Sequence, residues 1–248
     1  MKRIIIPARF ASSRLPQKLL LPLQGKPLLL HTYERALKCN FDSVVIATDD
    51  ERIADVARAV GAEVCMTSID HPSGTDRCAE AFATLGYHED DIIVCVQGDE
   101  PLIPIANVWS VAQNLENYPR ADVTTLYDPI YEHEELFNPN AVKVVFDKNN
   151  YALYFSRAPI PWARDHFPAE VPDALHFFRH VGLYAYRGHF LKKYLGLERS
   201  PLEILESLEQ LRVLWHGYRI HVDLAPDATP PGVDTQASFD AVKKILEG

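Results

Sequence analysis

Short apolar runs alternate with amphipathic stretches along the first hundred residues. Each run is continuously apolar, which is typical of strands that are covered on both faces. The runs stand at 3–7, 43–47, 63–66 and 92–96. Between them, the stretches 28–39, 51–60 and 75–86 repeat apolar residues at helical spacing. This order predicts an α/β fold with a doubly wound, mostly parallel sheet.

The second half of the chain follows a different pattern. Period-2 alternation at 142–146 and 151–155 predicts a β-hairpin. Ser200 and Glu203, three residues apart, form a capping box and predict the start of a helix. The Pro-rich stretch 158–172 predicts an irregular, mobile segment. Further strands are expected at 181–186 and 219–224, with one long helix near 200–215 and a last helix at 236–246.

The composition is that of an ordinary globular chain, with 248 residues, 47% hydrophobic and 24% charged. That length allows one large core, or one core with a smaller lobe. No apolar run approaches the roughly 20 residues that span a bilayer, and the start lacks a secretion signal, so we expect a cytoplasmic protein without a membrane partner. A pI near 5.5 argues against a general nucleic-acid binder. Widely spaced cysteines are expected to be reduced packing residues: Cys39, Cys65, Cys78 and Cys95.

Positive charge is concentrated at the amino-terminal end of this acidic chain. The first 33 residues hold six basic side chains and no carboxylate, although the formal net charge is -9. The stretch 7–18 follows the first apolar run and predicts a loop at the carboxyl end of a strand, where open α/β sheets bind ligands. A polyphosphate suits such a loop, and the alternative is a solvated basic loop. The basic residues are Lys2, Arg3, Arg9, Arg14, Lys18 and Lys26.

Two carboxylates are candidates for a Mg²⁺ site. Asp99 follows the apolar run 92–96 and stands beside Gly98, and Asp234 follows Gly232 after the late strand. Mg²⁺ takes oxygen ligands and needs only one or two protein carboxylates, because substrate phosphates and water complete its shell. The alternative for Asp99 is a turn or cap residue. The alternative for Asp234 is the N-cap of the last helix.

Other segments carry donors and acceptors that could hold a ligand. The loop 71–77 combines small residues with an arginine at a helix start, which suits an anion or a base edge, or is a plain capping turn. Arg157, if buried, needs an acidic partner or a ligand. His180 at a strand start is either a ligand contact or structural. Glu209 and Gln210, in the middle of the expected helix, form a solvated face unless a ligand claims them.

Eight blocks of the sequence, taken in their order along the chain, resemble the 3-deoxy-manno-octulosonate cytidylyltransferases, also called CMP-Kdo synthetases. The resemblance spans nearly the whole chain, and it departs from the family pattern at Gln17, where glycine is expected. It implies a Rossmann-like nucleotidyltransferase sheet with a smaller mixed lobe for sugar binding and dimerisation. The blocks are 7–18, 47–49, 73–77, 97–101, 137–140, 152–157, 208–214 and 232–235.

The resemblance implies a reaction in which CTP and the sugar acid Kdo give CMP-Kdo and pyrophosphate, for lipopolysaccharide synthesis. The anomeric hydroxyl of Kdo would attack the α-phosphorus of CTP in line with the leaving pyrophosphate. Arg9, Arg14 and Lys18 would hold the triphosphate and, with Asp99, form the catalytic set. Asp99 and Asp234 would share Mg²⁺.

The resemblance also assigns the remaining contacts. The nucleotide would be held by Pro7, Ala8, Arg9, Ser13, Arg14, Lys18, Thr48, Asp49, Ser73, Gly74, Thr75, Arg77 and Gln97. The sugar acid would be held by Gln97, Arg157, His180, Tyr184, Glu209 and Gln210. One nucleotidyltransferase domain would span 1–248, with 1–130 mainly binding nucleotide, 131–225 mainly binding sugar and forming the dimer, and 226–248 returning to the nucleotide side. The hairpin region 140–160 implies a homodimer.

Three alternatives stay open from the sequence. The substrate could be a related acid, such as 8-amino-Kdo or a sialic acid. A non-catalytic nucleotide-binding protein is a second reading. A Rossmann oxidoreductase is disfavoured, because the first strand is followed by an arginine-rich loop without the Gly-x-Gly-x-x-Gly fingerprint.

Overall fold

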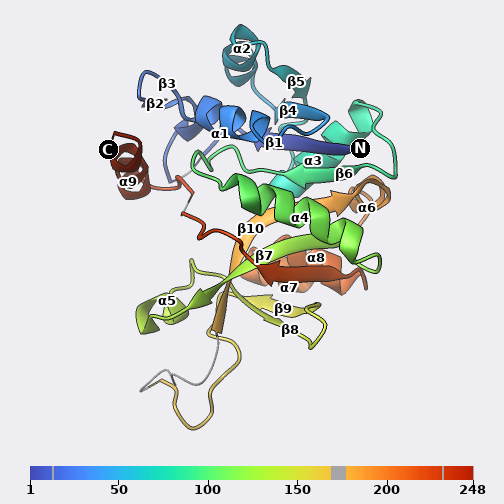
Figure 1. Ribbon diagram of the computed structural model, residues 1–248, viewed down its shortest axis with the longest axis vertical. Helices are drawn as coiled ribbons and strands as arrows, with labels where there is room; N and C mark the ends of the chain where they lie inside the picture. The colour runs from blue at the N-terminus through green and yellow to red at the C-terminus, as the bar shows by residue number, and fades with distance from the viewer. Residues whose placement is uncertain (13, 169–176, 231, 248) are drawn as a thin grey trace.

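A computed structural model describes residues 1–12, 14–168, 177–230 and 232–247 of the chain. A nine-stranded sheet runs through the molecule, and its main path has the order β11-β7-β10-β6-β1-β4-β5 (Figure 1). Its parallel part confirms the four predicted strands, β1 (Lys2–Ala8), β4 (Ser43–Thr48), β5 (Glu63–Met66) and β6 (Ile92–Cys95). The predicted helices between them are α1 (Leu28–Leu37), α2 (Glu51–Ala59) and α3 (Gly74–Thr84).

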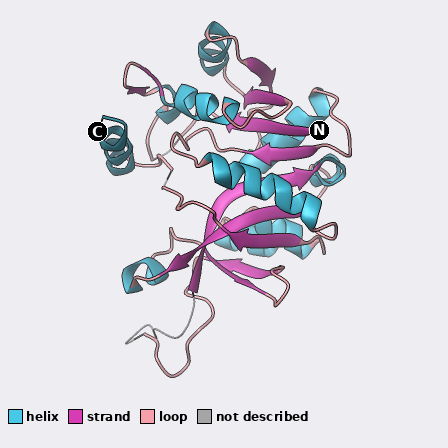
Figure 2. Cartoon of the chain, in the orientation of Figure 1, coloured by secondary structure: helices cyan, strands magenta, loops and turns pink. Residues whose placement is uncertain are grey.

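Helices cover both faces of the sheet, as a doubly wound fold requires (Figure 2). Alternate residues of β1 explain the two layers: Ile4 and Ile6 belong to the core under α1 and α4 (Ile105–Asn117), whereas Ile5 belongs to the core under α3 and α6 (Gly188–Tyr194). All three isoleucines are fully buried. The continuous apolar character of this strand therefore follows from burial on both faces.

The sheet is extended by strands from the second half of the chain. The strand β10 (Phe177–Arg187) pairs antiparallel with both β6 and β7 (Val123–Ile130), and β11 (Ile220–Leu224) lies parallel to β7. The strands expected at 181–186 and 219–224 are therefore confirmed. The sequence patterns did not predict α4, β7 and α6, whose apolar residues are buried against the sheet.

The predicted hairpin is present as β8 (Lys143–Phe146) and β9 (Ala152–Ser156), which pair antiparallel. Arg179 pairs with Lys143, and His180 N donates to Val142 O at 2.7 Å, which joins the hairpin to β10. Smaller elements are β2 (Pro22–Leu23) and β3 (Lys26–Pro27), the 3-10 helix η1 (Lys18–Leu20) and α5 (His133–Phe137), and the last helix is α9 (Gln236–Glu247), as predicted.

The single long helix expected near 200–215 is wrong. The chain forms α7 (Pro201–Glu206) and α8 (Gln210–Trp215), separated by Ser207 with a left-handed φ of 52°. Ser200 caps α7 as predicted, because its Oγ accepts from Glu203 N at 3.0 Å. The Glu203 carboxylate, however, binds Arg212. The break leaves Glu209 at the N-cap of α8 instead of on a solvated helix face.

The Pro-rich stretch contains no helix or strand from 158 to 168, and the rest of it, 169–172, lies outside the described residues. In the described ranges, no helix is long and apolar enough to cross a bilayer. All four cysteines are free and buried, as expected.

Lys143 on β8 predicts how the stability of the fold changes with pH. Its side chain is fully buried, and its Nζ donates to Asn138 O at 2.8 Å. Burial, with the charge of Arg157, lowers the pKa of Lys143 from 10.5 to about 8. Between these values the unfolded chain keeps the proton and the folded chain does not, so this group adds stability as the pH rises. We expect the free energy of unfolding of the wild type to rise relative to Lys143→Met from about pH 8 to 10.5.

Urea denaturation of both proteins across this range measures the difference. Below the window both states carry the proton, so the difference between the two proteins should be constant there. A difference that is flat through the window would contradict the buried-lysine interpretation.

Candidate active site

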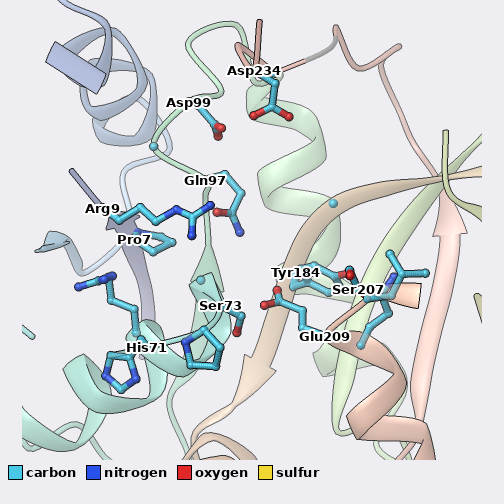
Figure 3. A pocket seen from close by; sticks show the side chains of 18 of the residues that line it. Pro7, Arg9, His71, Ser73, Gln97, Asp99, Tyr184, Ser207, Glu209 and Asp234 are labelled. Atoms are coloured by element: carbon cyan, nitrogen blue, oxygen red, sulfur yellow. The ribbon is translucent and has the colours of Figure 1, made fainter. Parts of the chain in front are cut away.

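A cavity of about 620 Å³ lies at the carboxyl ends of β1 and β6, between the sheet and the start of α8 (Figure 3). Arg9 and Gln97 lie on one side of it, Tyr184 and Glu209 lie on the other, and Asp99 and Asp234 lie together at one end. Most of the predicted site residues line it: Pro7, Arg9, Lys18, Ser73, Gly74, Arg77, Gln97, Asp99, His180, Tyr184, Glu209, Gln210 and Asp234. The fold therefore brings distant sequence blocks to one place.

Lys18 lies between the two candidate metal carboxylates. Its Nζ donates to Asp234 Oδ1 at 2.6 Å and also to Asp99 Oδ2. Arg14 adds a second cation, with its NH2 group 2.9 Å from Asp234 Oδ2. Burial alone would lower the pKa of Lys18, but the charges and hydrogen bonds of Asp99 and Asp234 outweigh it, so the pKa is raised. The ammonium group therefore stays charged at neutral pH.

The loop that carries these cations turns at Gln17, where the resemblance leads us to expect glycine. Gln17 has a φ of 56°, in the left-handed region, and precedes η1. Glycine enters this region without a steric penalty, whereas other residues enter it at a cost. Gln17 nevertheless takes the left-handed conformation, so the turn is present, and Lys18 follows it directly.

The segment between β11 and α9 carries Asp234 back to the sheet. Val233 N donates to Asp99 O at 2.9 Å, which holds the two aspartates side by side. Gly232 allows this approach, because a Cβ there would lie 3.1 Å from Glu100 Oε1. The N-cap role considered for Asp234 falls to Thr235, whose Oγ1 accepts from Ser238 N at 3.2 Å.

The donors fit a hard divalent cation. Two carboxylate oxygens from separate segments meet at one positive centre, the Lys18 ammonium group, which marks where a cation is stabilised. Across the described residues, no three His, Cys, Asp or Glu side chains form a cluster that could hold a metal ion. A Mg²⁺ ion here would therefore need oxygens from a bound phosphate and from water, which is its usual preference.

Glu100 lines the same end of the cavity and was missed in the sequence analysis, although it stands within the block 97–101. Burial, together with the neighbouring charges of Asp99 and Asp234, raises its pKa to about 8. In the absence of a bound cation, this carboxyl group is therefore largely protonated at neutral pH.

The loop before α3 presents small polar groups to the cavity. Ser73 caps this helix: its Oγ accepts from Asp76 N at 3.2 Å and lies 2.5 Å from Asp76 Oδ2, to which the hydroxyl donates. Gly74 faces Gln97 closely, since a Cβ there would lie 3.0 Å from Gln97 Nε2. Arg77 donates to Thr67 Oγ1. The capping alternative is thus confirmed for Ser73, while the same residue lines the cavity.

The opposite wall combines neutral and acidic groups. His180 Nε2 lies 2.9 Å from Thr125 Oγ1, and burial, with the charge of Arg179, lowers the pKa of His180 to about 3. The imidazole is therefore neutral at working pH and is a poor base. Thr75 Oγ1 donates to Glu209 Oε1 at 2.8 Å. Burial raises the pKa of Glu209, while the hydrogen bonds from Thr75 oppose the shift.

Some predicted contacts lie outside the cavity lining. Arg157 donates to the carbonyls of Glu206 at 2.6 Å and Pro139 at 2.8 Å. Asp49 lies 3.6 Å from Arg77, behind the cavity wall. Ser13 is outside the described residues. The other predicted residues that do not line the cavity are Ala8, Arg14, Thr48 and Thr75.

Two charged residues of the wall, Arg199 and Glu203, were not predicted as site residues. The sequence offered Glu203 only as part of a helix cap. Its partner Arg212 is nine residues away across the helix break, a spacing that the expected unbroken helix gave no reason to consider.

Comparisons with known proteins place the chain among cytidylyltransferases. The profile of the cytidylyltransferase family matches residues 3–220. The 3-deoxy-manno-octulosonate cytidylyltransferase of Coxiella burnetii (strain Dugway) is 53% identical to this chain, and the match covers 97% of this chain and 98% of the relative. That of Nitrosococcus oceani is also 53% identical, and the match covers 98% of this chain and 96% of the relative.

Solved structures agree. A CMP:2-keto-3-deoxy-manno-octonic acid synthetase complexed with CTP is 42% identical, has a TM-score of 0.89, and the match covers 99% of this chain and 98% of that one. A cytidylyltransferase from Leptospira borgpetersenii shares the fold at 19% identity and a TM-score of 0.64, over 99% of this chain and 86% of its own.

Proposed function

This chain belongs to the 3-deoxy-manno-octulosonate cytidylyltransferase family of nucleotidyltransferases, and from this premise we propose roles for the residues of its cavity. The enzyme transfers CMP from CTP to Kdo, giving CMP-Kdo and pyrophosphate. Membership of this family displaces the alternatives of a non-catalytic nucleotide-binding protein and a Rossmann oxidoreductase.

One observation supports the assignment of roles above all: Lys18 contacts both Asp99 and Asp234, and Arg14 contacts Asp234, at the carboxyl ends of the parallel strands. Arg9, Arg14 and Lys18 bind the triphosphate and stabilise the charge that grows on the leaving pyrophosphate. When the triphosphate arrives, its oxygens compete for Lys18, which is then released from the two carboxylates.

We assign Mg²⁺ to the oxygens of Asp99 and Asp234. A divalent ion bound there would polarise the α-phosphate and lower the pKa of the attacking hydroxyl. The protein holds the two carboxylates in place through the Val233–Asp99 backbone hydrogen bond of 2.9 Å. His180, with its pKa of about 3, does not supply a general base at neutral pH, so positioning and electrostatics carry most of the catalysis.

The remaining walls divide between the two substrates. The loop with Ser73, Gly74, Thr75 and Arg77 binds the cytosine side, with Gln97 between nucleotide and sugar. His180, Tyr184, Glu209 and Gln210 form the sugar-acid side, where they offer both donors and acceptors to a polyhydroxylated acid. Arg157, bound to carbonyls of its own lobe, would support that side from behind the cavity lining. Residues 1–130 thus mainly serve CTP and 131–225 mainly serve Kdo.

The experiment that tests this function measures pyrophosphate release with CTP, Mg²⁺ and Kdo. Turnover that requires all three supports it. Parallel assays with 8-amino-Kdo and a sialic acid report the acid preference. If pyrophosphate is released with one of the other acids but not with Kdo, that acid is the substrate in place of Kdo.

We also propose a homodimer formed through the hairpin β8–β9. Leu153 on β9 is 63% exposed and Leu205 on α7 is 80% exposed. The end of α7 lies beside the end of β9, because Glu206 accepts from Ser156 Oγ at 2.6 Å. Exposed apolar side chains on these two neighbouring elements favour a protein interface.

In sedimentation experiments we expect a dimer of two 28.0 kDa chains for the wild type, and a monomer for the Leu153→Asp, Leu205→Asp double variant, because burying two carboxylates in the interface is costly. Ile69→Asp is the matched control, since Ile69 is 73% exposed on a distant loop and should leave the dimer intact. A monomeric wild type would refute the proposal.

We further propose a cytoplasmic enzyme whose product is used in lipopolysaccharide synthesis. Four free, buried cysteines suit a reducing compartment. Activation with CMP also makes the sugar acid a donor for a later glycosyl transfer.

A further inference from the structure

Arg212 on α8 lies behind the cavity wall and binds two carboxylates. Its side chain is 3% exposed. Nε and NH2 donate to Glu203 at 2.9 and 2.6 Å, and NH1 and NH2 donate to Asp76 at 2.8 and 3.3 Å. The guanidinium group also lies 4.6 Å from the centre of the Tyr194 ring. All three nitrogens of the fork are therefore engaged.

The two carboxylates belong to two walls of the cavity, which meet where Thr75 contacts Glu209. Asp76 lies in the first turn of α3, and its Oδ2 accepts the hydroxyl hydrogen of Ser73 at 2.5 Å. Glu203 lies in α7, which leads into the break before Glu209. Ser73, on one wall, and Glu209 and Gln210, on the other, all line the cavity. Arg212 thus joins the element that presents Ser73 to the elements that present Glu209 and Gln210.

A second contact joins the start of α3 to the start of α8 at the same place. Thr75, one residue before Asp76, donates from Oγ1 to Glu209 Oε1 at 2.8 Å. Thr75 Oγ1 also lies 2.8 Å from the Tyr186 hydroxyl, which is fixed on β10. Thr75 and Asp76, consecutive residues at the start of α3, therefore bind Glu209 and Arg212, which lie one helical turn apart at the start of α8.

A buried ion pair is a weak device for stability, because the cost of removing charges from water offsets much of their attraction. Its strength is geometric. The planar guanidinium fork allows few arrangements of two carboxylates, whereas lysine carries a point charge that tolerates many. In catalysis that depends on positioning, small displacements of binding groups reduce the rate strongly.

We propose that Arg212 is a positioning residue that fixes the start of α3 against the start of α8, and so sets the position of Ser73 relative to Glu209 and Gln210 in the cavity lining. This inference rests on the proposed function, in which the two walls bind CTP and the sugar acid. Arg212 does not touch either substrate; it acts through Asp76 and Glu203.

Two variants test the proposal. Arg212→Lys keeps the charge and removes the fork, and Asp76→Asn removes the charge that binds Arg212 to α3 while leaving the Arg212–Glu203 pair and the Thr75–Glu209 contact in place. The matched control is Arg187→Lys. Arg187 binds the carbonyls of Ala121 at 2.7 Å and Tyr118 at 3.3 Å near the opposite edge of the sheet, so it has an equally structural role far from the cavity.

The readouts are kcat/KM for CTP and for Kdo, and the calorimetric affinity for CTP, at a temperature where circular dichroism shows each protein folded. We expect both test variants to lose about tenfold or more in kcat/KM for both substrates, and Arg187→Lys to stay within about twofold of the wild type even if its Tm falls. If Arg212→Lys does not fold, Asp76→Asn decides alone.

Test variants that keep both values of kcat/KM near the wild type, or a control that loses as much as they do, would overturn the positioning role and leave the proposed function standing. A wild type that does not turn over Kdo but binds CTP would refute the proposed function. The affinities for CTP would then judge Arg212: tenfold weaker binding by Asp76→Asn supports the inference, and unchanged binding overturns it. A wild type that neither turns over nor binds CTP would overturn both.

Discussion

Asp99→Asn is expected to lower kcat by about a thousandfold, even at saturating Mg²⁺. Asparagine keeps the size of the side chain but loses the negative charge that, with Asp234, is proposed to hold the ion. A metal ion at the reacting phosphate supplies several kcal/mol of charge stabilisation, and each 1.36 kcal/mol corresponds to a factor of about ten in rate. Steady-state pyrophosphate release across a range of Mg²⁺ concentrations measures the effect.

Asp91→Asn is the matched control for this prediction. Asp91 directly precedes β6, the strand that Asp99 follows, and it binds the amino terminus at 3.0 Å and Arg3 Nε at 2.9 Å. Its loss should reduce stability and leave kcat close to that of the wild type, since it lies at the other end of the strand. Near-full turnover by Asp99→Asn would count decisively against the metal assignment.

Arg14→Glu is expected to raise the KM for CTP by about two orders of magnitude while the fold survives. Arg14 is 60% exposed and pairs with Asp234 at 2.9 Å, so its replacement opens no cavity in the core. Losing hydrogen bonds to a charged group costs about 1.5–3 kcal/mol, and the new carboxylate would also repel the triphosphate and Asp234. Initial rates at saturating Kdo and varied CTP measure KM, and thermal unfolding checks the fold.

Arg58→Glu provides the comparison for a charge reversal elsewhere. Arg58 on α2 is 48% exposed and pairs with Glu51 at 2.9 Å, so it matches Arg14 in exposure and partner. Its reversal changes the net charge equally and should leave the KM for CTP unchanged. Equal effects of the two reversals would mean that overall charge, and not a phosphate contact, governs CTP binding.

The parallel half of the fold was readable from the sequence because strands buried on both faces are continuously apolar. The runs containing Ile4–Ile6 and 92–96 became adjacent strands, β1 and β6. Parallel neighbours end at one edge of the sheet, so the residues following them, including Arg9 and Asp99, were expected in one place. They line one cavity.

The sequence by itself determined these strands, the hairpin and which charged residues follow the strand ends, since each depends on patterns within a few residues. Only the tertiary structure decided the rest. Ser207 takes a left-handed φ of 52°, which no local pattern requires of a serine, and this break turns Glu209 and Gln210 to the cavity. Asp76 meets Arg212 across 136 residues; such contacts form because charges buried by the packing of whole elements need partners, and spacing along the chain does not record them.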